Sequence, residues 1–117
     1  RWEEAGTEDA DLILVGYGPS ARVARSAMER ARKEGLKVGL FRPITLFPFP
    51  EKQIAALAKP GRTFLAVEMS AGQMIEDVRL AVNGQSPVYL TNRLGGMVPT
   101  PEDVRAKIHE ILEGRAN

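Results

Sequence analysis

Residues 12–20 read Leu12-Ile13-Leu14-Val15-Gly16-Tyr17-Gly18-Pro19-Ser20 and contain the strongest secondary-structure signal in the chain. The first four residues form an uninterrupted apolar run, which is typical of a strand buried on both faces of a parallel sheet. The glycines and Pro19 indicate a tight turn, and Ser20 is a candidate N-cap for the following helix. Apolar residues then recur at helical spacing up to Gly35, at Ala24, Ala27, Met28 and Ala31.

The same alternation of strand and helix continues to the end of the chain. Further strands are predicted at 37–41, 63–68 and 88–91. Further helices are predicted at 51–59, from the N-cap candidate Ser70 to Asn83, and from Thr100 onward. This alternation predicts the α/β class, with a three-layer α/β/α sandwich around a mostly parallel sheet. We expect one domain over residues 1–117, in which residues 1–11 are a polar lead-in.

Composition excludes several classes of function. Lys and Arg number 16 against 15 Asp and Glu, so the net charge of +1 does not favour nucleic acid or an anionic membrane as a partner. The chain has no cysteine and one histidine, which excludes iron–sulfur ligation and a histidine-rich metal site. No apolar run has the ~18 residues of a membrane span, and the first residues do not resemble a signal peptide. We therefore expect a cytoplasmic protein.

Loops after parallel strands are where open α/β sheets bind ligands. At the first of them, Gly16, Gly18 and Ser20 loosely match a dinucleotide fingerprint, so a nucleotide or coenzyme A site is an alternative function. Pro19 removes one amide donor, which favours a turn that only packs helix on strand. Along the helix, Arg22, Arg25, Arg32 and Lys33 lie off the apolar stripe and are predicted to form its solvated face.

Glu68 ends the third strand and is the most interesting carboxylate of the chain. It could act as a general base or accept hydrogen bonds as a structural or interface anchor. No second acid, lysine or histidine stands at matched spacing, which favours the anchor, and no catalytic or metal-binding residue is predicted. After the fourth strand, Arg93 could contact a partner or lie in a solvated turn.

The loop from Arg42 to Pro50 contains too many apolar residues for a solvated loop of an isolated domain. If they are exposed together, they form a patch of the kind that marks an interface. Alternatively, they fold back over the edge of the sheet as local core. Both interpretations remain open.

Three stretches carry a resemblance to a known family: Gly39–Pro50, Val67–Met74, and Gly95-Gly96 before Thr100-Pro101-Glu102. They closely resemble the C-terminal part of alpha subunits of 2-oxoacid:ferredoxin oxidoreductases, from about Thr7 to the last helix. The proline-rich run is the most specific of them, although the family often has Trp at Phe47 and Asn at Ser70. The resemblance implies a transketolase C-terminal-like domain, with an antiparallel edge strand at an unlocated position. It also implies that the chain is a C-terminal fragment of a longer subunit.

The resemblance further implies an enzyme that oxidatively decarboxylates a 2-oxoacid to an acyl-coenzyme A, using thiamine diphosphate, Mg²⁺, iron–sulfur clusters and coenzyme A. Those cofactors would lie in other domains and subunits, with none in this one, and Glu68 would not be the glutamate that activates the thiamine ring. We therefore expect a non-catalytic assembly domain. Its partners would be other parts of the same oxidoreductase, and ferredoxin through the complete complex. The predicted interface residues are Arg42, Pro43, Ile44, Leu46, Phe47, Phe49, Glu68 and Arg93.

Overall fold

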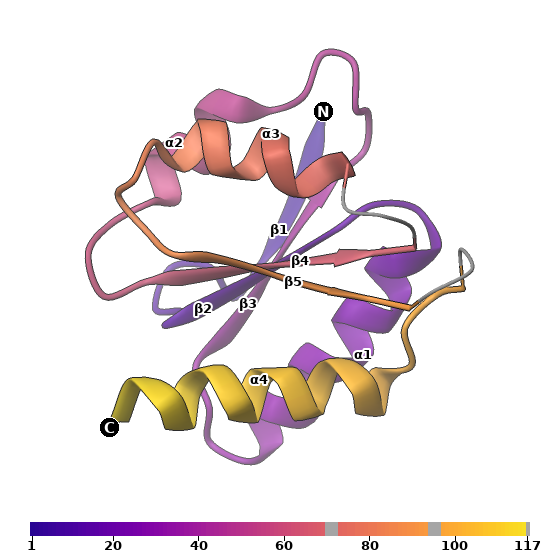
Figure 1. The fold of residues 1–117 in the computed structure, drawn as a ribbon, viewed down its shortest axis with the longest axis vertical. Helices are drawn as coiled ribbons and strands as arrows, with labels where there is room; N and C mark the ends of the chain where they lie inside the picture. Colours follow the sequence, from indigo (N-terminus) through magenta and orange to yellow (C-terminus); the bar gives the residue numbers. More distant parts are fainter. Residues whose placement is uncertain (70–72, 94–96, 117) are drawn as a thin grey trace.

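The computed structural model describes residues 1–69, 73–93 and 97–116, which form one five-stranded sheet and four helices (Figure 1). The strands are β1 (Trp2–Ala5), β2 (Leu12–Gly16), β3 (Val38–Pro43), β4 (Thr63–Glu68) and β5 (Val88–Asn92). The helices are α1 (Pro19–Lys33), α2 (Glu51–Leu57), α3 (Gln73–Val82) and α4 (Pro101–Ala116). The sheet order is β1-β3-β2-β4-β5, in which only the β1–β3 pair is antiparallel. The predicted α/β class with a mostly parallel sheet is confirmed.

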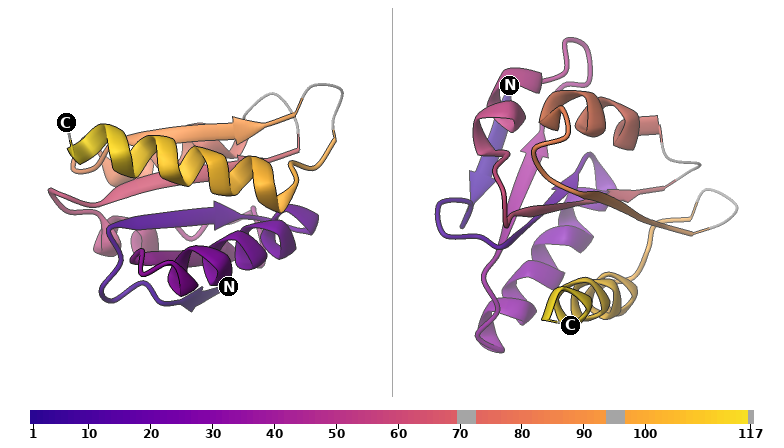
Figure 2. Two further views of the ribbon diagram at one scale, coloured as in Figure 1. Left: turned by 90° about the horizontal axis from the view of Figure 1, so that it is seen from below. Right: turned by 60° about the vertical axis from the view of Figure 1, so that its left-hand side comes forward.

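The central strands contribute to two separate cores, because successive residues of a strand point to opposite faces of the sheet. Leu12 and Leu14 of β2 pack in one cluster with residues of α1 and α4. Ile13 and Val15 pack in the other cluster with residues of α2 and α3. The ribbon views show the same division, with α1 and α4 on one side of the sheet and α2 and α3 on the other (Figures 1 and 2). The predicted three-layer sandwich is therefore confirmed.

The N-terminal segment, predicted only as a polar lead-in, contains a strand that was not predicted from the sequence, because Trp2–Ala5 forms β1. β1 pairs with β3 at the edge of the sheet, and Arg42 Nη1 of β3 lies 2.8 Å from Glu3 Oε1 of β1. A strand at a sheet edge can be short and charged, so its sequence lacks the apolar run by which buried strands are identified. β1 is the antiparallel edge strand that the family resemblance implies.

β3 continues to Pro43, two residues beyond the predicted end of the strand at Phe41. The ladder between β2 and β3 ends at Phe41, so the missing N–H group of Pro43 interrupts no bond to β2. Beyond that point only β1 pairs with β3, and the amide of Ile44 donates to the carbonyl oxygen of Arg1 at 2.9 Å. The loop that follows β3 therefore starts from a paired strand.

Helix starts agree with the prediction at α4 but not at α1. The amide of Thr100 donates to Asp103 Oδ2 at 3.0 Å, and the amide of Asp103 donates to Thr100 Oγ1 at 3.1 Å, which is a reciprocal capping box. The prediction of Ser20 as the N-cap of α1 is wrong. The helix begins at Pro19 without a side-chain cap, and Ser20 is buried inside its first turn.

Arg32, predicted to lie on the solvated face of α1, is only 33% exposed, because its guanidinium group joins three segments of the chain. It donates to the carbonyl oxygens of Val38 at 2.8 Å and Gly6 at 2.7 Å. Arg32 Nη2 also lies 2.8 Å from Asp9 Oδ1. The hydrogen bonds that Asp9 accepts from Arg32 lower the pKa of the Asp9 carboxyl group. Arg32 thus ties the connection between β1 and β2 to the first helix.

We expect Gly39→Ala to destabilise the fold by about 1–3 kcal/mol, because overpacking a tight contact forces backbone to move. A Cβ atom at Gly39 would lie 2.7 Å from the carbonyl oxygen of Gly6 and 3.1 Å from Thr7 Cα. Gly114→Ala is the control, since nothing lies within 4 Å of a Cβ atom there. Gly114 lies in the last turn of α4, where this change should stabilise by at most about 1 kcal/mol. Urea unfolding followed by circular dichroism measures both, and equal effects would contradict the packing argument.

Candidate functional site at the carboxyl ends of the strands

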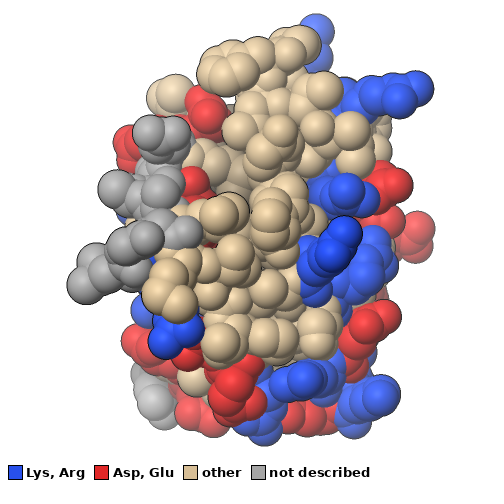
Figure 3. Space-filling model, turned by 90° about the vertical axis from the view of Figure 1, so that its right-hand side faces the viewer, with Lys and Arg blue, Asp and Glu red and all other residues tan. Residues whose placement is uncertain are grey.

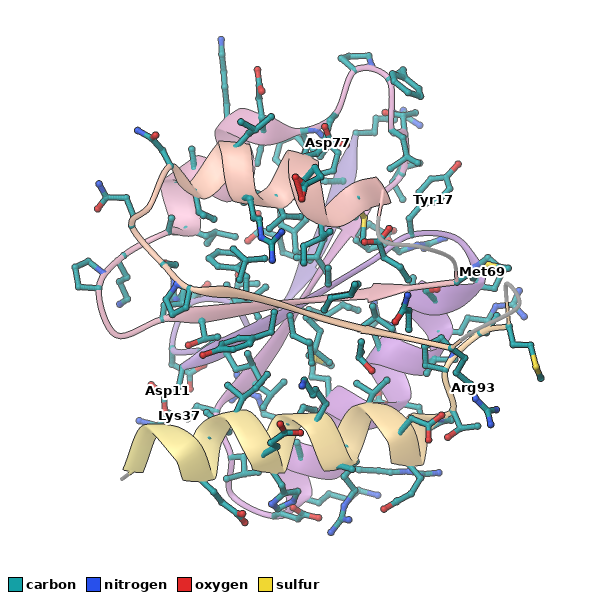
Figure 4. The ribbon with its side chains drawn as sticks, in the orientation of Figure 1. Asp11, Tyr17, Lys37, Met69, Asp77 and Arg93 are labelled. Atoms are coloured by element: carbon teal, nitrogen blue, oxygen red, sulfur yellow. The ribbon has the colours of Figure 1, made fainter. Side chains whose placement is uncertain are left out.

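The carboxyl ends of the parallel strands β2, β3, β4 and β5 lie at one edge of the sheet. Figure 4 shows Tyr17, Met69 and Arg93, which follow β2, β4 and β5, at this edge, whereas Asp11 and Lys37 lie at the opposite one. Figure 3 views the same edge and shows a broad uncharged surface with Lys and Arg side chains along one side. Ligands and partners of open α/β sheets approach from this direction. The candidate site is therefore sought here.

The turn between β2 and α1 is used to pack the helix on the strand. A Cβ atom at Gly16 would lie 3.1 Å from Ala21 Cα, so a side chain there would push the helix away. Gly18 has a φ of 61°, which L-residues with side chains rarely adopt. Both glycines therefore serve the turn itself. The alternative nucleotide or coenzyme A site at Gly16, Gly18 and Ser20 is not favoured.

Glu68 accepts hydrogen bonds from backbone amides in the first turn of α3. Its Oε1 accepts a hydrogen bond from the amide of Met74 at 2.7 Å, and its Oε2 accepts one from the amide of Ile75 at 2.8 Å. The residue is only 7% exposed, and a carboxylate at a helix N-terminus also interacts favourably with the helix dipole. Ser70, the predicted cap of this helix, lies outside the described residues. This geometry supports a structural role for Glu68, since both carboxylate oxygens accept backbone hydrogen bonds.

In the apolar loop after β3, some residues pack as local core and one is exposed, so each of the two interpretations describes part of the loop. Leu46 and Phe49 are half-buried and pack against the core cluster that contains Phe41 and Ile54. Phe47, between them in sequence, is 93% exposed. Of the other predicted interface residues here, Pro43 is buried, and Arg42 and Ile44 are half-buried. The inner side of the loop is thus local core, while its tip presents an aromatic ring to the outside.

A small cavity of about 150 Å³, which we term the strand-end cavity, opens at the same edge. Ser20 Oγ is buried and has no hydrogen-bond partner among the described residues, although a buried hydroxyl group normally has one. Most of the surrounding side chains are apolar, which suits the insertion of an apolar side chain from another segment. The lining residues are Tyr17, Ser20, Leu46, Val67, Glu68, Met69 and Met74.

Arg93 follows β5 and interacts with the start of α4. Its Nε lies 3.6 Å from Asp103 Oδ2. The backbone amide and the hydroxyl group of Thr100 lower the pKa of Asp103, and the charge of Arg93 lowers it further. Arg93 thus has an ionic partner at the start of α4, and it remains a candidate interface contact. The neighbouring glycines at 95 and 96, which belong to the family resemblance, lie outside the described residues.

Two residues of this edge were not selected from the sequence. Tyr17 is 41% exposed and Met69 is 37% exposed, and both border the strand-end cavity. The signal that could have identified them is their position, since each is a large apolar residue directly after a buried strand. The described ranges contain no group of three or more His, Cys, Asp or Glu side chains placed to bind a metal ion. No helix in them has both the length and the apolar character needed to span a bilayer.

We expect Glu68→Gln to lower the free energy of unfolding by about 1–3 kcal/mol, because one of the two α3 amides would lose its acceptor in a buried site. Glu76→Gln is the control in the first turn of the same helix. Glu76 forms an exposed ion pair with Arg79, so its loss should cost at most about 1 kcal/mol. Urea unfolding measures both variants. An unchanged stability of Glu68→Gln would show that its carboxylate does not hold the helix.

Known structures share this fold. A split-gene transketolase, solved as an inactive beta4 tetramer, matches with a TM-score of 0.79 and 19% identity, over 97% of this chain and 41% of that one. The 2-oxoglutarate:ferredoxin oxidoreductase of Magnetococcus marinus, solved with 2-oxoglutarate, coenzyme A and succinyl-CoA bound, matches with a TM-score of 0.71 and 24% identity. That match covers 94% of this chain and 19% of the other. At these identities the likeness shows the fold, which is that of transketolase and oxidoreductase domains.

Sequence comparison identifies the family. The family model for core domain II of pyruvate:ferredoxin oxidoreductase matches residues 10–104. The chain is 54% identical over 117 residues to ketoisovalerate oxidoreductase subunit VorB of Methanothermobacter marburgensis, which covers all of this chain and 33% of that subunit. The chain thus spans about a third of the length of this curated relative. It belongs to the family of core domain II of pyruvate:ferredoxin oxidoreductase.

Proposed function

We propose that this chain is a non-catalytic assembly domain, which packs on the other domains and subunits of a 2-oxoacid:ferredoxin oxidoreductase through its carboxyl edge. The observation behind the proposal is the exposed ring of Phe47, held between Leu46 and Phe49, which pack into the core. An aromatic side chain on a well-anchored loop loses little conformational freedom on binding, and aromatic residues are frequent among those that dominate interface energies. The strand-end cavity lies beside the same loop, because Leu46 lines it.

The residues of this domain do not suit the cofactors of the proposed complete enzyme. The chain has no cysteine to bind an iron–sulfur cluster, and its described carboxylates form no cluster for Mg²⁺. Glu68 is occupied with the amides of α3, so it is a poor candidate for activating thiamine diphosphate. We therefore assign thiamine diphosphate, Mg²⁺, the iron–sulfur clusters and coenzyme A to other domains and subunits. That residues 1–117 form a single domain of a longer subunit is part of the same proposal.

The proposed setting is a cytoplasmic complex that passes electrons to ferredoxin through its other subunits. The proposed interface comprises Arg42, Pro43, Ile44, Leu46, Phe47, Phe49, Glu68 and Arg93. Identity of 54% to a ketoisovalerate oxidoreductase subunit makes a branched-chain 2-oxoacid the first substrate to assay in the complete enzyme. The isolated chain should show no decarboxylase activity, and turnover without the other domains would contradict an assembly role.

We expect Phe47→Ser and Phe49→Ser to have different effects. Phe47→Ser removes an exposed ring, so it should change the free energy of unfolding by less than about 0.5 kcal/mol. It should nevertheless weaken assembly of the complete enzyme about tenfold or more, as the loss of an aromatic interface anchor does. Phe49→Ser should also cost about 1–3 kcal/mol of stability, because its ring packs on the core. Assembly is measured by size-exclusion chromatography and mass photometry, and stability by urea unfolding.

Leu80→Ser is the control for these variants. Leu80 is 76% exposed on α3 and does not belong to the proposed interface. Its replacement should leave assembly unchanged. Normal assembly of the Phe47→Ser variant, or equal weakening by Leu80→Ser, would contradict an interface at the carboxyl edge.

A further inference from the structure

An open groove of about 710 Å³ lies between α1 and the end of β3, beside the turn at Gly18. Three arginines line it: Arg22 and Arg25 from α1, and Arg42 from β3. Arg22 and Arg25 are exposed, and no described carboxylate forms an ion pair with either of them. Arg42 Nη1 donates to Glu3, while the buried Nε of Arg42 has no hydrogen-bond partner among the described residues. The groove therefore concentrates positive charge that the described residues leave largely unpaired.

The position of these charges is unfavourable for the domain itself. Arg22 and Arg25 lie in the first two turns of α1, where the helix dipole favours negative charge, and the first turn contains no acidic residue. They are also three residues apart on the helix surface, where like charges repel. The one carboxylate that lines the groove, Glu29, balances only part of this charge. Local stability thus gives no reason for both arginines, whereas a bound anion would.

We propose that this arginine groove binds a carboxylate-rich segment of another domain or subunit of the same enzyme. The inference rests on the assembly role proposed above and specifies the chemistry of the partner. The groove follows α1 from Gly18 to Glu29, roughly 16 Å at the rise of an α-helix, which suits about five residues of extended chain. Arg42 connects it to the proposed interface at the loop after β3.

Two features favour protein carboxylates over a phosphorylated small molecule. The groove is lined mainly by side chains of successive helical turns, whereas phosphates at helix starts are usually held by backbone amides, one of which Pro19 removes. Glu29 also lies within it, and its charge opposes a phosphate dianion more strongly than a single carboxylate. Arginine pairs with a carboxylate through two parallel hydrogen bonds, so the groove can bind acidic side chains in a defined register.

The test is charge reversal in the assembled enzyme. Arg22→Glu with Arg25→Glu should weaken assembly about tenfold or more at low ionic strength. Arg30→Glu with Lys33→Glu makes the same change of charge on exposed residues near the other end of α1 and should leave assembly within about threefold. Salt should weaken assembly of the wild-type enzyme steeply, because charges are screened over about 10 Å at ~0.1 M salt. The Arg22/Arg25 variant should show a much flatter salt dependence.

Thermal unfolding of the isolated chain separates this role in assembly from a structural role within the domain. The Arg22/Arg25 variant should melt at the same temperature as the wild type or higher, and the Arg30/Lys33 variant at a lower one, because acidic residues suit only the start of a helix. A large fall in the melting temperature of the Arg22/Arg25 variant, or wild-type assembly at every salt concentration, would overturn the inference. If Phe47→Ser weakens assembly and charge reversal does not, the assembly role stands and the acidic partner is wrong. If neither does, both proposals fail.

The partner is identified with Arg22→Lys and Arg25→Lys, which keep the charge and introduce amines for zero-length carbodiimide coupling. Mass spectrometry should find these lysines joined to Asp or Glu residues of another domain or subunit. Coupling to Glu29 or Glu3 alone, or no coupling, would overturn the proposal. A rise in melting temperature with inorganic phosphate or ATP, lost on charge reversal while assembly is unchanged, would instead identify a small-anion site and equally overturn it.

Discussion

The burial of β2 on both faces is the constraint from which the rest of the structure follows. All five of its residues are buried, and none of their backbone groups can be left without a partner in the interior. Parallel strands on either side provide the hydrogen bonds, and two pairs of helices cover the two apolar faces. Each crossover between parallel strands then contains a helix. The turn at Gly16 allows α1 to approach β2 because no Cβ atom intervenes.

The same constraint explains why residues typical of active sites have structural roles here. The glycine-rich turn brings helix and strand together, and Glu68 provides acceptors for the first amides of α3. The groups that remain available at the carboxyl edge are the tip of the loop after β3, the strand-end cavity and the arginine groove. Such a set suits contact with protein better than chemistry.

Three features of the chain do not favour the stability of the isolated domain, and they support a surface for contact with protein. A buried hydroxyl group without a described partner at Ser20 and cations at the positive end of α1 each cost the isolated domain some stability, and the exposed phenyl ring at Phe47 adds little to it. All three lie around the carboxyl edge. Sequences are usually consistent with their fold at every level, and local conflicts concentrate where function requires them. Together they agree with a surface that is covered in the complete enzyme.

Features that depend on short-range chemistry could be predicted from the sequence. Apolar runs located β2 and β4, and the start of α4 was predicted at Thr100, where the structure has a capping box. Contacts between distant segments became known only from the three-dimensional fold. The fold revealed β1, an exposed strand that is held by its pairing with β3 and not by an apolar core. It also showed that Phe47 is exposed whereas Phe49 packs on the core. It also joined Arg32 to Gly6 and Val38, and placed Arg42 across a groove from Arg22 and Arg25. Such contacts depend on how strands and helices pack in three dimensions, which the local pattern of residues does not encode.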